Sequence, residues 1–269
     1  MRMSSSRLFQ PIVRSQPPIV ICPYLYESER DEIRINFRLS EPSGQRLEFF
    51  LWQDVNRIGP EHAFEHCWKQ FPDRDIIIVH SDMAPMPEDV SNEWYDALVE
   101  QRNRYPDAGM LGCNLFSFRS SPKEPLHVWY AGGIFRNGEI DHLHGPVKLD
   151  CEEMQGCVPK SILQRAREVA WCTFAGVLIR REVIRDCGDF DRRYQWAYVM
   201  DVDYSLEARK RDYHLLQVPV ALQHYGSRTT SKVTKENPEL KTKASQNFQL
   251  FYEKWRPSHS GLLKGPSPD

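Results

Sequence analysis

Four acidic and imidazole side chains stand at the ends of segments whose patterns predict regular secondary structure. Asp82 closely follows the apolar run "DIIIV", and His224 closely follows "LLQVPVAL". Asp201 and Asp203 open the amphipathic segment "DVDYSLEARKR". A carboxylate and an imidazole that meet can share a divalent cation and leave coordination positions open for phosphate oxygens. An Asp201 that is ionised near a helix N-terminus could accept the proton of an attacking hydroxyl, as a general base.

Each of these side chains also has an ordinary structural explanation. An isolated Asp82 more often caps a helix or forms a turn, and an isolated His224 is more often a hydrogen-bonded loop histidine. For Asp203 we expect helix capping. The chemical interpretation therefore depends on convergence of Asp82, Asp201 and His224 at one cleft.

The segments that would position these residues alternate between strand and helix patterns. Apolar runs predict strands within 17–25, 46–54, 74–82 and 108–118, and helical spacing with acidic starts or basic ends predicts helices within 29–41, 59–71 and 87–106. This alternation predicts an α/β fold with a mostly parallel, Rossmann-related central sheet flanked by helices. Such sheets bind ligands at the carboxyl ends of their strands, where Asp82 falls.

The second half has a looser pattern before order resumes. Residues 123–169, with "YAGGIFRNGEIDHLHGPV", read as an insertion or a substrate-facing loop that ends in a charged helical stretch at 159–170. A strand and a short helix with a glycine stop are expected within 171–191, then a helix at 201–211 and a strand at 215–222. A polar loop and a final helix should fill 231–257.

Composition narrows the class of protein. The chain has 269 residues, is 41% hydrophobic and carries a net charge of −2, which fits a globular protein without an electrostatic footprint for nucleic acid. No run of eighteen apolar residues occurs, and the apolar segment near the N-terminus is too short for a secretory signal. We therefore expect a cytoplasmic protein that is at most peripheral to a membrane. Seven scattered cysteines are expected as reduced, buried thiols.

Further candidates are histidines and tryptophans in the second half. No G-x-x-x-x-G-K-[ST] or G-x-G-x-x-G motif occurs, so a metal would have to offset phosphate charge. His142 and His144 alternate in "EIDHLHG", where substrate hydrogen bonding and plain loop structure are equally open. Trp171 and Trp196 are core residues by base rate, yet aromatic rings at a cleft also stack on sugars.

The order of motifs resembles a known family. "WCTFAGVLIRREVIRDCGDFDRRYQWAYVMDVDYSLEARKRDYHLLQVPVALQHYGSRTT" is similar to the C-terminal half of family 2 glycosyltransferases of the GT-A fold, especially the rhamnosyltransferase-like group. "DIIIVHSDMAPMP" resembles the strand and a divergent D-x-D motif of that family, and "NRIGPEHAFEHCW" its Asn-x-Gly helix start. The similarity covers residues 18 to 230.

The resemblance implies roles for individual residues. Asp82 would be the metal-binding acid, with His80 at the position of the first acid of D-x-D, and His224 would complete the metal and pyrophosphate site. Asp201 would be the catalytic base and Asp54 the residue near the nucleotide base. The other donor-side positions are Gly176 and Arg228, and the acceptor-side positions are Trp196, His142, His144 and Trp171.

The resemblance also implies the reaction and its partners. It implies an inverting transfer from a UDP-, GDP- or dTDP-sugar to a glycan or lipid-linked acceptor, with Mn²⁺ or Mg²⁺. It implies one GT-A domain over 18–257, with a nucleotide-sugar half at 18–118 and an acceptor half at 119–257, between a disordered tail at 1–17 and a flexible tail at 258–269. The alternative is a catalytically silent GT-A-like carbohydrate-binding or scaffold domain, because His80 and Met200 replace acids of the family pattern.

Overall fold

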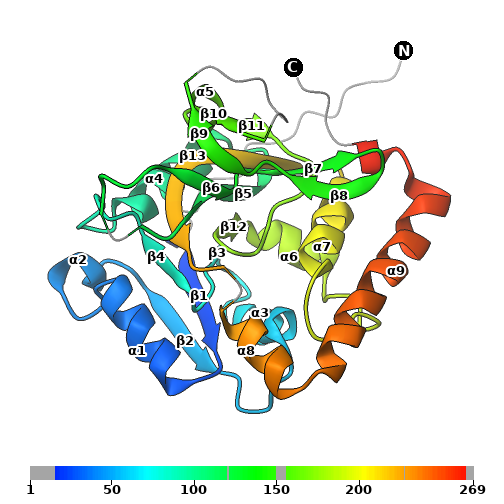
Figure 1. The fold of residues 1–269 in the computed structure, drawn as a ribbon, viewed down its shortest axis with the longest axis horizontal. Helices are drawn as coiled ribbons and strands as arrows, with labels where there is room; N and C mark the ends of the chain where they lie inside the picture. The colour runs from blue at the N-terminus through cyan, green and yellow to red at the C-terminus, as the bar shows by residue number, and fades with distance from the viewer. Residues whose placement is uncertain (1–15, 120, 150–155, 227, 265–269) are drawn as a thin grey trace, which may run out of the picture.

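A computed structural model describes residues 16–119, 121–149, 156–226 and 228–264. A central mixed sheet is flanked by helices: α3 packs on β1, α4 and α6 pack on β5, and α7 packs on β13 (Figure 1). The main strands are β1 (Ile19–Tyr24), β2 (Phe49–Gln53), β3 (Ile76–Ile78), β5 (Ala108–Ser117), β12 (Val177–Ile179) and β13 (His214–His224). The helices are α1 (Glu27–Asn36), α2 (Pro42–Gln45), α3 (Pro60–Trp68), α4 (Glu93–Arg104), α5 (Lys160–Leu163), α6 (Arg181–Cys187), α7 (Met200–Arg209), α8 (Arg228–Glu236) and α9 (Glu239–His259), followed by a short 3₁₀ turn, η1 (Leu262–Lys264).

The strand directions confirm the predicted fold class. β2, β1 and β3 pair in parallel, as do β5 and β13, while β12 runs antiparallel between β3 and β5. Five of these six main strands therefore point the same way. Ile21, for example, lies opposite Phe50 on one side and Ile78 on the other.

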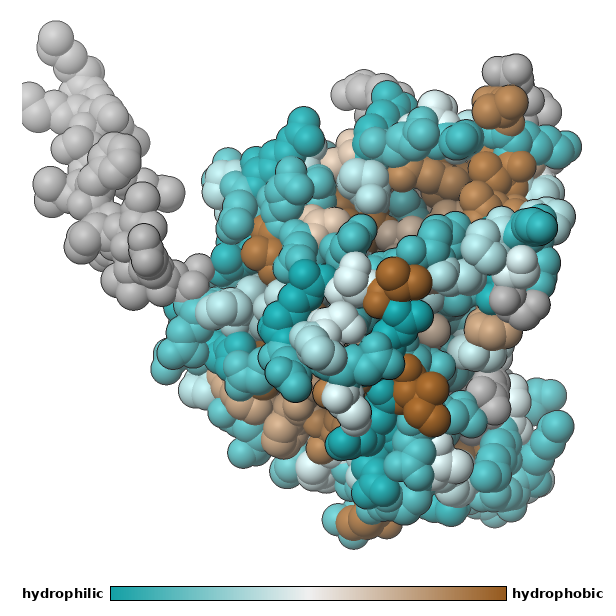
Figure 2. Space-filling view, turned by 90° about the vertical axis from the view of Figure 1, so that its left-hand side faces the viewer, coloured by the Kyte–Doolittle hydropathy of each residue, from teal (hydrophilic) through white to brown (hydrophobic). Residues whose placement is uncertain are grey.

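The apolar runs without alternation belong to strands covered on both faces. Every residue of β1 and of β3 is buried, because helices lie over both sides of a mostly parallel sheet. Trp68 of α3 extends the core toward the second half of the chain, since its ring lies 5.1 Å from that of Phe190 and 5.5 Å from that of Tyr204. The face of the molecule in Figure 2 is mainly hydrophilic, with hydrophobic groups in separate patches.

The segment 123–169, expected as a loop or insertion, contains short strands. β6 (His127–Tyr130) pairs with β5, β9 (Gly145–Lys148) with β6 and β10 (Val158–Pro159) with β9, so the segment extends the sheet at one edge. β7 (Gly133–Arg136) and β8 (Glu139–His142) form a separate hairpin through a turn at Asn137 and Gly138, both with positive φ. The helix expected over 159–170 is only one turn, α5, followed by β11 (Arg167–Glu168), which pairs with β13.

The C-terminal part departs from the predicted loop and tail. The polar segment after His224 forms a helix, α8, and α9 continues to His259. Leu263, in η1, is 4% exposed and packs in the main core, so the ordered region passes the predicted boundary at 257. The expected tail at 1–17 and the end of the expected tail at 258–269 lie largely outside the described residues.

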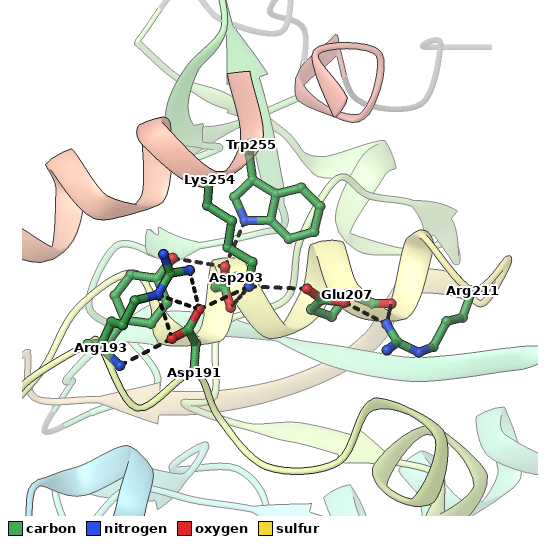
Figure 3. Close-up of polar contacts among 8 residues, drawn as sticks. Asp191, Arg193, Asp203, Glu207, Arg211, Lys254 and Trp255 are labelled. Carbon is green, nitrogen blue, oxygen red and sulfur yellow. Dashed lines mark hydrogen bonds and ion pairs between the residues drawn. The ribbon is translucent and has the colours of Figure 1, made fainter. Parts of the chain in front are cut away.

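Asp203 holds α9 on α7 and does not cap a helix, which corrects the expected role. Its carboxylate accepts hydrogen bonds from Tyr194 Oη at 2.9 Å, Trp255 Nε1 at 2.7 Å and Lys254 Nζ at 2.9 Å (Figure 3). The expected capping is not seen because the Asp203 side chain points toward α9. Its partners there lie about fifty positions away in the sequence, and no local pattern indicates such a contact. α9 is thereby fixed along one side of the molecule, next to α7 (Figure 1).

The cysteines also depart in part from the expectation of reduced thiols. Five are free, and four of these, Cys22, Cys67, Cys113 and Cys172, are buried. Cys157 is disulfide-bonded, and its partner is not among the described residues.

Within the described ranges, no helix is both long and apolar enough to cross a membrane.

Candidate functional site

Two strand ends bring His80, Asp82 and His224 together. The short strand β4 (Met83–Pro85) follows β3 and pairs antiparallel with the end of β13, so that Met83 lies opposite His224. Asp82 Oδ1 then lies 3.2 Å from His224 Nε2. The potential ligand atoms of all three residues lie within 4.8 Å of one another.

This cluster has the donor set of a divalent metal site. Two imidazoles and one carboxylate are ligands that Mn²⁺ and related ions accept while keeping open positions. Burial, with the nearby His224, lowers the pKa of His80 to about 4, so His80 presents a neutral imidazole. His224 Nε2 is buried and makes no hydrogen bond to any described group. Because Gly226 N donates to His224 Nδ1 at 3.2 Å, Nε2 carries the proton in this arrangement. A cation held by Nε2 would require the proton on Nδ1 instead, and the hydrogen bond from Gly226 N would then be given up.

A cavity of about 380 Å³ opens next to the cluster. His80 and Asp82 line one part of it, and Asp201 lines another. Eight aromatic side chains line it: Tyr24, Phe64, Trp129, Tyr130, Trp171, Trp196, Tyr198 and Phe248. Trp129 connects the cavity to the cluster, because its ring lies 4.1 Å from that of His224. A concave, aromatic site with a few polar groups is the usual form of a small-ligand site.

Asp201 is half-buried at the start of α7, where the expected general base should lie. Burial raises its pKa to about 6, against hydrogen bonds from the backbone of Val202 and Phe174 and from the Thr173 side chain, which lower it. The carboxylate is therefore ionised at neutral pH yet basic enough to take a proton. The preceding loop has positive φ at Trp196, Tyr198 and Val199, a strained backbone of the kind that is found at functional sites.

Glu61 is a cavity residue that the sequence analysis missed. It lies in the first turn of α3 and is only 8% exposed. Burial, together with the charge of Asp201, raises its pKa to about 8. In the sequence, Glu61 reads as an ordinary acid in the first turn of a helix, so no local signal marks it.

The other predicted donor-side residues take mixed positions. Asp54 lines the cavity, but its carboxylate accepts hydrogen bonds from Ile58 N at 3.0 Å and Gly59 N at 3.3 Å, so it shapes the turn before α3. Gly176, by contrast, is not among the lining residues: it has φ +78°, and its backbone bonds to Ile78 O and Cys113 N within the sheet. The structure thus places Gly176 in the sheet, and the predicted contact of this residue with the donor stays a prediction. Arg228 is the first residue of α8, and its side chain lies outside what is described.

The predicted acceptor-side residues separate into two groups. Trp196, Trp171 and His142 line the cavity, whereas His144 is exposed and is not among the lining residues. Trp171 Nε1 donates to the backbone oxygens of Ile134 and Asp141, which fixes its ring in the wall. His144 forms with His142 and Asp141 a second group of possible metal ligands, but Arg136 pairs with Asp141 at 2.9 Å.

No protein-family model and no curated protein matches the chain. Among solved structures, GalNAc-T7 with UDP, GalNAc and Mn²⁺ has a TM-score of 0.48 and 13% identity, over 77% of this chain and 37% of that one. Mannosyltransferase PcManGT from Pyrobaculum calidifontis in complex with GDP-Man and Mn²⁺ has a TM-score of 0.45 and 15% identity, over 78% of this chain and 56% of that one. A197 from STIV has a TM-score of 0.40 and 10% identity, over 76% of this chain and 82% of that one. This chain spans less than two thirds of the first two chains, and with TM-scores under 0.5 these likenesses establish neither family nor function.

Proposed function

We propose that the protein is a glycosyltransferase that moves a sugar from a nucleotide-sugar donor to a hydroxyl of a glycan or lipid-linked acceptor. One observation carries this proposal: His80 and Asp82, two members of a cluster completed by His224, line the same aromatic cavity as Asp201, a carboxylate suited to act as a base. The motif order supports a GT-A enzyme of family 2, with the rhamnosyltransferase-like group as the nearest pattern. We place it in the cytoplasm, with at most peripheral contact to a membrane.

His80, Asp82 and His224 would hold the cation, Mn²⁺ or Mg²⁺, beside the leaving diphosphate of a UDP-, GDP- or dTDP-sugar. When bound, the cation would supply positive charge against the negative charge that develops on the leaving group. The aromatic walls give flat apolar surfaces on which sugar rings or a base can stack.

Asp201 would carry the proton transfer. The acceptor hydroxyl gives its proton to an Asp201 carboxylate oxygen while the hydroxyl oxygen bonds to the anomeric carbon, and the bond from that carbon to the diphosphate breaks. Such a direct displacement inverts the anomeric centre. The Thr173 side chain and the Val202 and Phe174 backbone N–H groups hold the carboxylate in place as it changes charge.

A second candidate is a silent carbohydrate-binding domain of the same fold. This candidate is supported by the contacts of the His224 ring: Gly226 N donates to Nδ1, and the protonated Nε2 faces Asp82. The two side chains then lie 3.2 Å apart as a polar contact that needs no cation to hold it. This reading keeps the cavity as a sugar site and assigns no turnover.

The test combines metal, donor and turnover. Wild type is incubated with UDP-, GDP- and dTDP-sugars, with Mn²⁺ or Mg²⁺, while thermal shift and slow donor hydrolysis are measured. We expect one donor to give a cation-dependent shift and hydrolysis, His224→Asn to lose both, and Asp201→Asn to keep the shift but lose turnover. His214→Asn is the matched control, because His214 is exposed at the other end of β13. Donor binding without hydrolysis in wild type would favour the silent domain, and no cation-dependent shift with any donor would refute both the metal role and the transferase.

A further inference from the structure

One corner of the cavity lies where the start of α3 meets the loop before α7. We call Glu61, Trp196 and Asp201 the acid corner; all three line the cavity. Gly59 brings the two segments together, because a Cβ on this residue would lie 2.8 Å from the backbone oxygen of Trp196. The backbone of Tyr198 also donates a hydrogen bond to the Glu61 carboxyl, which ties the loop to α3.

Two polar atoms of the acid corner have no hydrogen-bond partner among the described residues. Glu61 Oε2 and Trp196 Nε1 are both buried and make no hydrogen bond to any group in the part of the chain that the structure describes. Buried polar atoms in folded proteins are almost always hydrogen-bonded, to protein, water or ligand. Two such atoms in one cavity wall indicate that a polar ligand completes this part of the site.

The two carboxyls of the acid corner differ in charge at neutral pH. Burial and the negative charge of Asp201 raise the pKa of Glu61 to about 8, whereas the pKa of Asp201 is raised only to about 6. The Tyr198 phenol also faces Glu61, and its pKa is raised too. Near pH 7, Glu61 is thus a neutral hydrogen-bond donor and Asp201 an ionised acceptor, the separation of roles that paired carboxyls in enzymes use.

We propose that the acid corner is a subsite for a carbohydrate with two neighbouring free hydroxyl groups. The neutral Glu61 carboxyl donates to the oxygen of one hydroxyl, and Asp201 accepts from the next hydroxyl. Trp196 Nε1 donates a further hydrogen bond to the same sugar. This assignment rests on the proposed function, because it names the acceptor end of that reaction and the hydroxyl that Asp201 would deprotonate.

A purely structural role for Glu61 would be the tether to Tyr198 N. Glu61→Gln separates the two roles, because Gln keeps the carbonyl that accepts from Tyr198 N and permanently donates through its amide. Glu61→Ala removes both. Glu65→Gln is a matched control, since Glu65 is equally buried on α3 but pairs with Lys69 and Arg192 and does not line the cavity.

The experiment measures binding of methyl mannoside, methyl galactoside and methyl glucoside, with deoxy analogues that lack one of two neighbouring hydroxyls, by calorimetric titration at pH 7 and pH 9. Because the neutral fraction of a group with a pKa of about 8 falls about tenfold over that range, wild-type affinity should fall about tenfold. Glu61→Gln should keep its affinity at pH 9, and Glu61→Ala should lose about two- to tenfold at pH 7, the worth of one hydrogen bond. Wild type should bind the deoxy analogue with an affinity about two- to tenfold lower than that of the parent glycoside. Glu65→Gln should bind the glycosides with wild-type affinity at both pH values.

Three results would overturn the proposal. They are the absence of saturable glycoside binding to wild type, an equal fall of affinity between pH 7 and pH 9 in wild type and Glu61→Gln, and an unchanged affinity in Glu61→Ala at pH 7. Infrared spectra give a second readout, since the wild type at pH 7 should show the carbonyl band of a protonated carboxyl that Glu61→Gln lacks. Cation-dependent donor binding is measured in the same variants. Donor binding without a Glu61 effect rejects the subsite alone, whereas glycoside binding without cation-dependent donor binding rejects the transferase alone.

Discussion

Replacement of Asp203 by alanine should be among the most destabilising single changes in the chain. The Asp203 carboxylate is 3% exposed and accepts from Tyr194, Trp255 and Lys254 at 2.7–2.9 Å (Figure 3). Alanine would leave the Trp255 indole N–H and the Tyr194 hydroxyl without their acceptor in the interior. It would also remove the contacts of Asp203 in α7 with Lys254 and Trp255 in α9.

The magnitude follows from those bonds. Hydrogen bonds to a charged group contribute about 1.5–3 kcal/mol each, and they do not add fully. Lys254 keeps Glu207 at 3.1 Å and Asp191 at 3.5 Å, so its charge stays paired and the largest penalty for a stranded buried ion is avoided. We therefore expect a loss of about 3–5 kcal/mol in the free energy of unfolding, as when one partner of a buried pair is removed.

Denaturant unfolding followed by fluorescence and circular dichroism measures this loss. Asp203→Asn should give a smaller loss, because its amide oxygen still accepts from Trp255 or Tyr194. Asp96→Ala is the control: Asp96 is exposed in its pair with Arg46, and such surface pairs contribute about 0–1 kcal/mol. If Asp203→Ala costs no more than Asp96→Ala, the contacts of α9 do not hold the fold together and this reasoning is refuted.

Three further outcomes follow from the cavity. Since Asp201 must be ionised to act as a base and its pKa is raised to about 6, kcat/KM for the donor found in the cation screen should fall about tenfold per pH unit below about 6, and a pH–rate profile that stays flat to pH 5 would contradict its role. The raised pKa of Glu61 means that the folded state holds this proton more tightly than the unfolded chain, so its contribution to stability is complete below about pH 4.5 and is lost as pH rises through about 8; Glu61→Gln should therefore show a smaller fall in unfolding free energy than wild type between those values, by up to about 4 kcal/mol, in denaturant titrations at several pH values. Gly59→Ala should cost about 1–3 kcal/mol and weaken glycoside binding, because Gly59 has φ +98° and its new Cβ would press on the Trp196 backbone; thermal unfolding and calorimetry measure both effects, and wild-type values in both would show that this contact is not needed.

The sequence predicted the part of the site that strand ends determine. Asp82 and His224 follow strongly apolar runs, and such runs become central strands whose ends meet at one edge of a sheet. Of the three residues expected to converge, Asp82 and His224 lie 3.2 Å apart, and Asp201 lines the cavity that Asp82 also lines. The pattern could not show that β4 pairs with the end of β13 and so brings the two side chains together. β4 has only three residues, Met83–Pro85, and ends in proline, so no strand pattern marks it.

Asp201 and Trp196 were predicted as site residues, but their grouping with Glu61 could not be predicted, because it depends on contacts between distant segments. Asn247 of α9 accepts from Gln195 N at 3.0 Å and donates to Gln195 O at 2.9 Å and Ala197 O at 2.8 Å, which pins the strained loop from fifty residues away. Asp203 in turn fixes α9 through Lys254 and Trp255. In the sequence, Asn247, Asp203 and Lys254 read as ordinary polar residues of helices. Because Tyr198 of the same loop bonds to the Glu61 carboxyl, we expect the docking of α9 to influence the pKa of Glu61 through this loop. Asp203→Ala should then shift the alkaline limit of glycoside binding as well as the stability.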